Sequence, residues 1–168
     1  MEENVTTVEL PKKRPTFLTV LCILSFIGSG GFGLLYSAYQ YVTFDKTYPA
    51  QVEKLTEALE QLENAGMDSG FFYNNAQNSL IQLEIMSKNL ETIVGTNCLF
   101  AILSLFGIFL MFKLKKSGFY LYTFVNLFWL LVPLALIDFE ATLMNVMIGG
   151  AITILFIILY AVNLKHME

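Results

Sequence analysis

Four long apolar segments, each without a single Asp, Glu, Lys or Arg, most constrain what this chain can fold into. They cover residues 17–41, 93–112, 119–137 and 143–162. About 20 apolar residues in a helix cross the hydrocarbon core of a bilayer, whereas the strands of a membrane barrel alternate apolar and polar positions. The pattern therefore predicts an all-α integral membrane protein with four transmembrane helices.

The composition supports this prediction and excludes several classes of function. The chain is 55% hydrophobic and 14% charged, whereas soluble domains are about 45–50% apolar and about 25% charged. Its net charge of -4 offers no basic excess for nucleic acid. Two Cys and one His are too few for a disulfide scaffold or a histidine zinc site. We therefore expect the lipid bilayer as a partner and no nucleic acid.

Basic residues concentrate on one side of the predicted topology. The termini and the connection between spans two and three hold Lys12, Lys13, Arg14, Lys113, Lys115, Lys116 and Lys165, against Lys46, Lys54 and Lys88 on the other side. Because basic loops stay in the cytoplasm, we expect a multi-pass membrane protein with both termini cytoplasmic. The predicted order is a cytoplasmic tail (1–16), span one (17–42), an extracytoplasmic segment (43–92), span two (93–112), a basic cytoplasmic turn (113–118), span three (119–137), an outer loop (138–142), span four (143–163) and a cytoplasmic tail (164–168).

The segment 43–92 carries two apolar stripes at helical spacing. One comprises Val52, Leu55, Leu59 and Leu62, and the other Ala76, Leu80, Leu83, Ser87 and Leu90. Apolar residues spaced by three and four lie on one face of a helix. Two such helices joined by a short turn bury their stripes against each other. We therefore predict an extracytoplasmic αα-hairpin.

Local signals place the ends of the two hairpin helices. Pro49 is expected at the first position of the first helix, and Gly66 just past its end in the left-handed conformation. Residues 68–69, or alternatively 74–75, are expected to cap the second helix. No proline lies between residues 74 and 112, so this helix is predicted to run into span two, with Gly95 as its weak point.

Three acidic residues, Glu53, Glu57 and Glu60, fall on one face of the first hairpin helix. We interpret them as a solvated face opposite the apolar stripe. The alternative is a weak surface for a divalent cation or a basic partner.

Three aromatic residues, Phe71, Phe72 and Tyr73, lie at the predicted tip of the hairpin. The favoured interpretation is that they cap the hairpin core. The alternative is a docking patch, because large exposed aromatics often anchor interfaces.

Span one contains a run of small residues. Residues 28–33 match G-x-G-x-x-G, but no strand precedes them and no βαβ unit surrounds them, so we reject a nucleotide site. Small residues four apart let another helix approach closely, within this chain or in a second one. The predicted helix-packing residues are Ser25, Ser29, Gly33, Ser37, Gly149 and Gly150. The alternative is that residues 28–33 unwind the span, as in the substrate sites of transporters.

The spans contain no charged residue, and their notable polar residues are Asn97, Asn126 and Asn145. Side chains of this kind hydrogen-bond between helices at about 0.6–2 kcal/mol each. We favour this structural role over a polar permeation path. No catalytic triad or carboxylate pair is recognisable, so the sequence predicts no enzyme, no catalytic residue, no cofactor and no metal site.

Two segments resemble known membrane proteins. The basic turn at 112–122 and the opening of span one at 15–25 are similar to those of many small four-span inner-membrane proteins from Bacteroidota. The resemblance implies a bacterial inner membrane, and no activity or functional residue follows from it.

Packing surfaces without site chemistry favour a structural or interaction role, as an accessory subunit that binds a protein partner or its own copies. One alternative is a small oligomeric transporter or channel, suggested by the glycine cluster and the Asn residues. A second alternative is a membrane sensor whose outer hairpin binds a ligand.

Overall fold

The computed structural model describes residues 14–136 and 139–168, and within them every regular element is a helix. Predictions that concern Lys12, Lys13 and Asp138 lie outside the described residues. The elements are α1 (Thr16–Phe26), the π-helix η1 (Ile27–Leu35), α2 (Tyr36–Asn64), α3 (Phe71–Phe112), α4 (Lys116–Leu136), α5 (Phe139–Val162) and the short 3₁₀ helix η2 (Leu164–His166).

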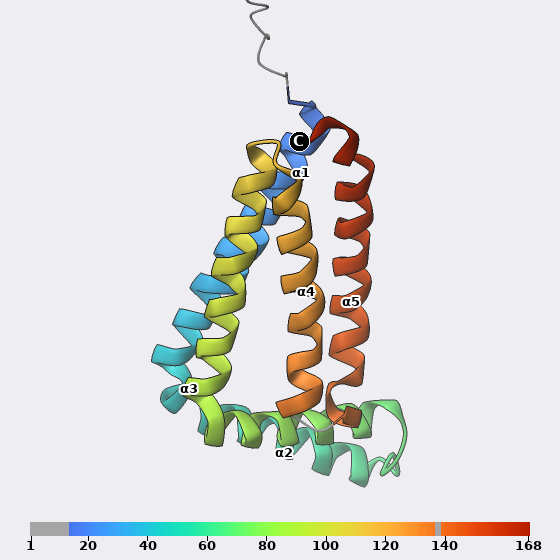
Figure 1. The fold of residues 1–168 in the computed structure, drawn as a ribbon. Helices are drawn as coiled ribbons and strands as arrows, with labels where there is room; N and C mark the ends of the chain where they lie inside the picture. The colour runs from blue at the N-terminus through green and yellow to red at the C-terminus, as the bar shows by residue number, and fades with distance from the viewer. Residues whose placement is uncertain (1–13, 137–138) are drawn as a thin grey trace, which may run out of the picture.

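Four helical stretches in the described residues are long and apolar enough to cross a membrane. They are Thr16–Asn64, Phe71–Phe112, Lys116–Leu134 and Val146–His166. Figure 1 shows α4 and α5 side by side with the upper parts of the other two stretches, as a bundle. The prediction of an all-helical chain with four such helices is confirmed at this level.

The second half of α2 and the first part of α3 lie across one end of the bundle (Figure 1). We call residues 49–88 the arm, and this end of the bundle the arm end. Pro49 lies inside α2 and does not begin a helix, so that prediction is wrong. Because proline lacks an N–H group and its ring crowds the preceding turn, it bends a helix that continues through it. The bend in α3 lies at Asn89, whose φ of -129° and ψ of 25° are not helical. The weak point is thus Asn89 and not Gly95.

The turn between the arm helices depends on two glycines. Gly66 has a φ of 72°, as predicted. Its amide and that of Met67 donate to carbonyls in the last turn of α2 at 2.9 and 2.8 Å, which is the Schellman arrangement. The residue before α3 is Gly70, with a φ of 100° and no side-chain cap. The predicted capping by residues 68–69 or 74–75 is therefore wrong, because the helix begins at Phe71, between the two pairs.

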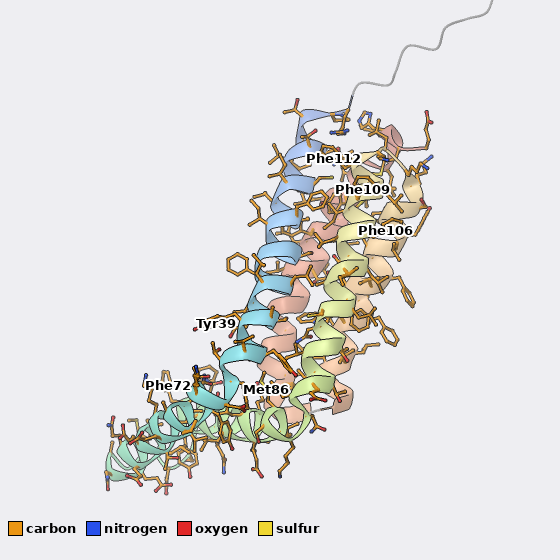
Figure 2. All side chains as sticks on the ribbon, turned by 90° about the vertical axis from the view of Figure 1, so that its left-hand side faces the viewer. Tyr39, Phe72, Met86, Phe106, Phe109 and Phe112 are labelled. Carbon is orange, nitrogen blue, oxygen red and sulfur yellow. The ribbon has the colours of Figure 1, made fainter. Side chains whose placement is uncertain are left out.

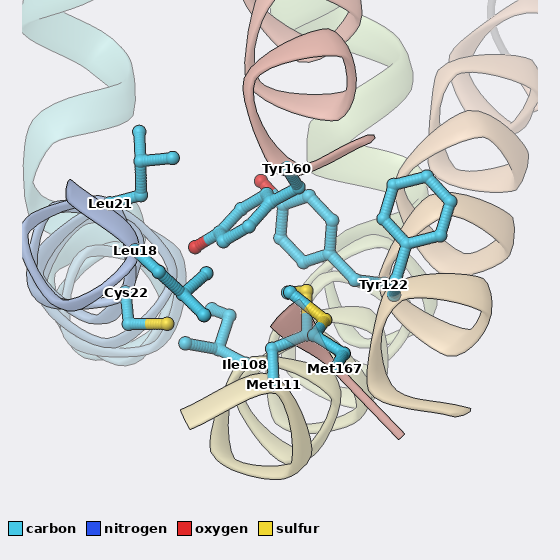
Figure 3. Close-up of a cluster of buried hydrophobic side chains, with 9 residues drawn as sticks. Leu18, Leu21, Cys22, Ile108, Met111, Tyr122, Tyr160 and Met167 are labelled. Atoms are coloured by element: carbon cyan, nitrogen blue, oxygen red, sulfur yellow. The ribbon is translucent and has the colours of Figure 1, made fainter. Parts of the chain in front are cut away.

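The most buried part of the bundle lies at the end opposite the arm, which we call the basic end. Figure 3 shows side chains from four helices and the C-terminal segment meeting there. The cluster comprises Leu18, Leu21, Cys22, Ile108, Met111, Phe119, Tyr122, Tyr160 and Met167. After η2 the chain folds back, so that Met167 is only 3% exposed. The amide of Glu168 donates to the carbonyl of Leu114, and the amide of Lys116 donates to the carbonyl of Glu168, both at 2.7 Å.

Helices α3 and α4 approach each other most closely at two glycines. A β-carbon built at Gly118 would lie 2.5 Å from the carbonyl oxygen of Gly107. One built at Gly107 would lie 3.0 Å from the backbone nitrogen of Tyr122. The two backbones therefore touch without intervening side chains, close to the connection that joins the helices.

Candidate functional site

A cleft of about 460 Å³ lies between the helices, with lining residues from α1, η1, α2, α3, α4 and α5. Ligand sites in proteins commonly measure about 300–1,000 Å³. Helix α1 meets α5 near the basic end, and the chain from η1 to α2 then runs away from α5 toward the arm end (Figure 1). Several large side chains of the lining are also more than half exposed, namely Leu24, Phe32 and Tyr36 on one side and Ile152 on the other. The cleft therefore opens between η1 and α5.

One wall of the cleft is the π-helix η1, whose sequence IGSGGFGLL holds four glycines in nine residues. Gly28, Ser29 and Gly33 line the cleft. The segment keeps a helical backbone, so it is wider than an α-helix but is not unwound into coil. Segments of π-helix are rare and often occur at functional sites.

Three side chains form a polar centre in the cleft, which we call the serine–asparagine cluster: Ser29, Ser104 and Asn126. The hydroxyl oxygens of Ser29 and Ser104 are 3.1 Å apart. The amide nitrogen of Asn126 donates to the hydroxyl of Ser104 at 3.1 Å and to the backbone carbonyl of Tyr122 at 2.8 Å. The cluster therefore links η1, α3 and α4.

Tyr160 packs behind the basic end of the cleft. Its side chain is 0% exposed, and its hydroxyl donates to that of Ser25 at 2.8 Å. Its ring packs edge-to-face on that of Tyr122, with 5.2 Å between the ring centres. Both Ser25 and Tyr122 line the cleft, so this contact forms its end wall.

Two further polar contacts lie along the cleft toward the arm end. The indole nitrogen of Trp129 donates to the side-chain oxygen of Asn97 at 3.0 Å. The amide nitrogen of Gln40 lies 3.3 Å from the sulfur of Met86. Asn97, Trp129 and Gln40 all line the cleft. Asn97 therefore pairs with an indole, a partner that the sequence analysis did not identify.

Four residues of the predicted small-residue stripe of span one make contacts within this chain. Ser25 bonds to α5 and Ser29 to α3, as described above. A β-carbon at Gly33 would lie 3.1 Å from that of Ala101 in α3. Ser37 donates to the carbonyl of Gly33 in its own helix at 2.6 Å. The stripe thus holds span one against its neighbours and also forms a wall of the cleft.

The small residues of α5 pack more loosely. A β-carbon at Gly149 or Gly150 would meet side chains of α4 at 4.0 and 3.7 Å, which is ordinary contact. The side chain of Asn145 lies outside the described residues. Of the three predicted Asn residues, the structure therefore places Asn97 and Asn126 in the cleft.

No pattern in the sequence marks Ser104, Trp129 or Tyr160 as site residues. Their partners lie 75, 32 and 135 residues away in the chain. The only local signal for these three residues is that each carries a polar atom within an apolar run. This signal does not distinguish a side chain that bonds inside the bundle from one that lies at the membrane surface.

The tip of the arm is a second surface of interest. Phe71 and Phe72 are 59% and 70% exposed, which does not suit a cap on the hairpin core. Tyr73 is partly buried, and its hydroxyl donates to a carboxylate oxygen of Glu63 at 2.9 Å. This hydrogen bond raises the pKa of Tyr73. Phe72, labelled in Figure 2, also lines an open groove of the arm together with Met67.

The acidic residues of the arm show no sign of a metal site. Glu53, Glu57 and Glu60 are exposed. A search of the described residues finds no group of three or more His, Cys, Asp or Glu side chains placed to hold a metal ion.

These features define the class as an all-helical protein with four helices suited to cross a membrane and, between them, a mostly apolar cleft with a polar centre. Comparisons with protein-family models, with curated proteins and with solved structures find no match.

Proposed function

We propose that the chain is a multi-pass protein of a bacterial inner membrane with both termini in the cytoplasm. The distribution of charge in the fold supports this orientation. Arg14, Lys113, Lys115, Lys116 and Lys165 gather at the basic end, whereas residues 45–91 hold eight acidic and three basic side chains. Basic residues favour the cytoplasmic side, so the arm is the extracytoplasmic part.

Aromatic side chains suit this placement. Figure 2 shows Phe106, Phe109 and Phe112 along α3. The guanidinium of Arg14 lies 3.5 Å from the ring centre of Phe112, and the ammonium of Lys113 lies 4.5 Å from that of Phe109. Long cationic side chains over aromatic rings are expected where hydrocarbon meets headgroups.

Within the membrane we propose a non-enzymatic interaction role, as an accessory subunit of a membrane assembly. The observation that carries this proposal is the exposed aromatic tip of the arm. Phe71, Phe72 and Met67 are each about half exposed or more, and they lie on an acidic arm outside the spans. Large apolar side chains that project into water at such a site typically anchor a protein partner.

Replacing Phe71 and Phe72 by serine is expected to release a partner that purifies with the native protein from membranes in mild detergent. Each anchoring aromatic of an interface contributes about 2 kcal/mol or more, so recovery should fall at least tenfold. The matched control is Ile81→Ser, an apolar arm residue that is 37% exposed and lies away from the tip. A native protein that purifies alone as a monomer, or a partner that the double variant retains, would contradict the proposal.

The cleft favours a second function, a small transporter. The cleft ends at Tyr160 near the basic end and opens beside η1. Because the basic end faces the cytoplasm in the proposed orientation, this arrangement suits a transporter in a state closed toward the cytoplasm. We expect Asn126→Leu to reduce solute flux into liposomes at least tenfold, because it removes the amide that links the serine–asparagine cluster to α4. The control is Phe124→Leu, which changes a residue of the same helix that is 65% exposed. No flux across a broad panel of ions and solutes would dismiss this function.

A further inference from the structure

We propose that the cleft binds an uncharged lipid-like amphiphile whose headgroup carries hydroxyl or carbonyl oxygens. The inference rests on the proposed membrane setting, but not on the role of the arm tip. Its basis is the charge, the hydrogen-bonding capacity and the opening of the cleft.

The lining of the cleft excludes a charged headgroup. None of the described residues that form it is Asp, Glu, Lys, Arg or His. A charge placed there would lose its water without gaining a partner, at a cost of several kcal/mol. A phosphate, a carboxylate or an ammonium group is therefore a poor ligand, and a neutral polar headgroup is a good one.

The serine–asparagine cluster provides a place for such a headgroup. A hydroxyl group has one hydrogen to donate. One bond joins Ser29 to Ser104, and Ser104 accepts a second from Asn126. Whichever serine donates to the other, one hydroxyl hydrogen of the pair is left for another acceptor. A hydroxyl or carbonyl oxygen of the ligand supplies that acceptor.

The rest of the cleft suits an apolar tail. At its opening the side chains of Phe32 and Ile152 are apolar and more than half exposed. Tyr160 blocks the basic end, so a ligand enters from the side of the bundle, between η1 and α5, where the membrane hydrocarbon lies in the proposed setting. A volume of about 460 Å³ suits the headgroup and the first part of a chain, with the remainder in the bilayer.

The single tryptophan of the chain makes this proposal measurable. Trp129 lines the cleft, and bromine atoms on a lipid chain quench tryptophan fluorescence at contact. The full-length protein is reconstituted in phosphatidylcholine, and brominated diacylglycerol, brominated phosphatidylglycerol, brominated fatty acid and brominated phosphatidylcholine are titrated separately. We expect saturable quenching at low mole fraction with diacylglycerol, and weak quenching without saturation with the two anionic lipids and with phosphatidylcholine.

Two glycine variants distinguish the cleft from the general lipid surface. Gly28 lines the cleft and Gly31 does not, and a β-carbon at either position meets nothing within 4 Å. Gly28→Leu should fill the cleft and weaken diacylglycerol binding roughly tenfold. Gly31→Leu should leave it unchanged. Ser104→Ala, which removes one hydroxyl of the cluster, should weaken binding severalfold without a change in helix content.

Equal quenching by all four lipids would overturn the proposal, because it would make the cleft ordinary lipid-facing surface. Diacylglycerol binding that survives Gly28→Leu would overturn it too. A third contrary result would come from the Gly28→Cys variant, carrying a cross-linker on the new cysteine, in native membranes. If the cross-linker captured a protein instead of a lipid, a helix of another protein would occupy the cleft, and the proposal would be overturned. The variant with serine at positions 71 and 72 should bind diacylglycerol normally, and the Gly28→Leu variant should retain the protein partner. The lipid-binding proposal and the accessory-subunit proposal can therefore fail independently of each other.

Discussion

Tyr160→Ala is expected to destabilise the bundle by about 3 kcal/mol, the low end of the cost of truncating a buried aromatic. The side chain is fully buried among the residues of the core cluster (Figure 3). Removing it deletes the edge-to-face contact with Tyr122 and the hydrogen bond to Ser25. It also leaves a cavity, because the neighbouring helices relax only partially around the missing ring. Inside a bilayer this packing is a main driving force for helix association.

The stability of purified protein can be measured by unfolding in mixed micelles with increasing sodium dodecyl sulfate. Tyr160→Phe keeps the ring and removes only the hydroxyl, so it should cost about 0.6 kcal/mol, the average for an interhelical hydrogen bond. The control is Tyr120→Ala, which truncates a tyrosine at the same end of the bundle that is 63% exposed. A change within about 0.5 kcal/mol is expected there. Equal midpoints for the two alanine variants would refute the structural role of Tyr160.

The four long apolar helices were predictable because each apolar run has the length that a bilayer demands, and this needs no knowledge of its neighbours. Gly66 was predictable for a similar reason, since only its local conformation matters. The position of Pro49 inside a helix and the bend at Asn89 were not predictable. Proline suits either the start of a helix or a bend within it, and the choice depends on whether the preceding turn stays helical. The apolar stripes of the arm predicted a hairpin, but gave no sign that the arm lies across the end of the bundle (Figure 1).

The cleft could be predicted only in part. Asn126, Ser29 and Gly33 stood out because polar or small residues are unusual within apolar runs. Their arrangement around a common space depends on how four helices cross, and no spacing within one helix encodes that. Ser104 illustrates the limit, because its importance comes from Ser29 and Asn126 on two other elements.

Gly118→Ala is expected to destabilise the bundle by about 1–3 kcal/mol, the usual cost of overpacking a tight contact. The new β-carbon would lie 2.5 Å from the carbonyl oxygen of Gly107 and 2.6 Å from the backbone nitrogen of Met111. Both are backbone atoms in α3, so neither can move aside as the end of a flexible side chain can. The helices must separate, and Gly118→Leu should prevent the native packing of α3 against α4.

A matched alanine substitution tests whether the close backbone contact, and not the loss of a glycine as such, causes the destabilisation expected for Gly118→Ala. Gly31→Ala adds a β-carbon that meets nothing within 4 Å. Alanine favours a helix over glycine by about 1 kcal/mol, so this variant should be as stable as the native protein or more stable. Unfolding midpoints in sodium dodecyl sulfate, with helix content from circular dichroism, distinguish the two. If Gly118→Ala were as stable as the native protein, α3 and α4 would have to be farther apart than the structure places them.

Small residues four apart on one helix indicate a packing face. Gly107 and Gly118 lie on different helices, so their contact becomes visible only in three dimensions.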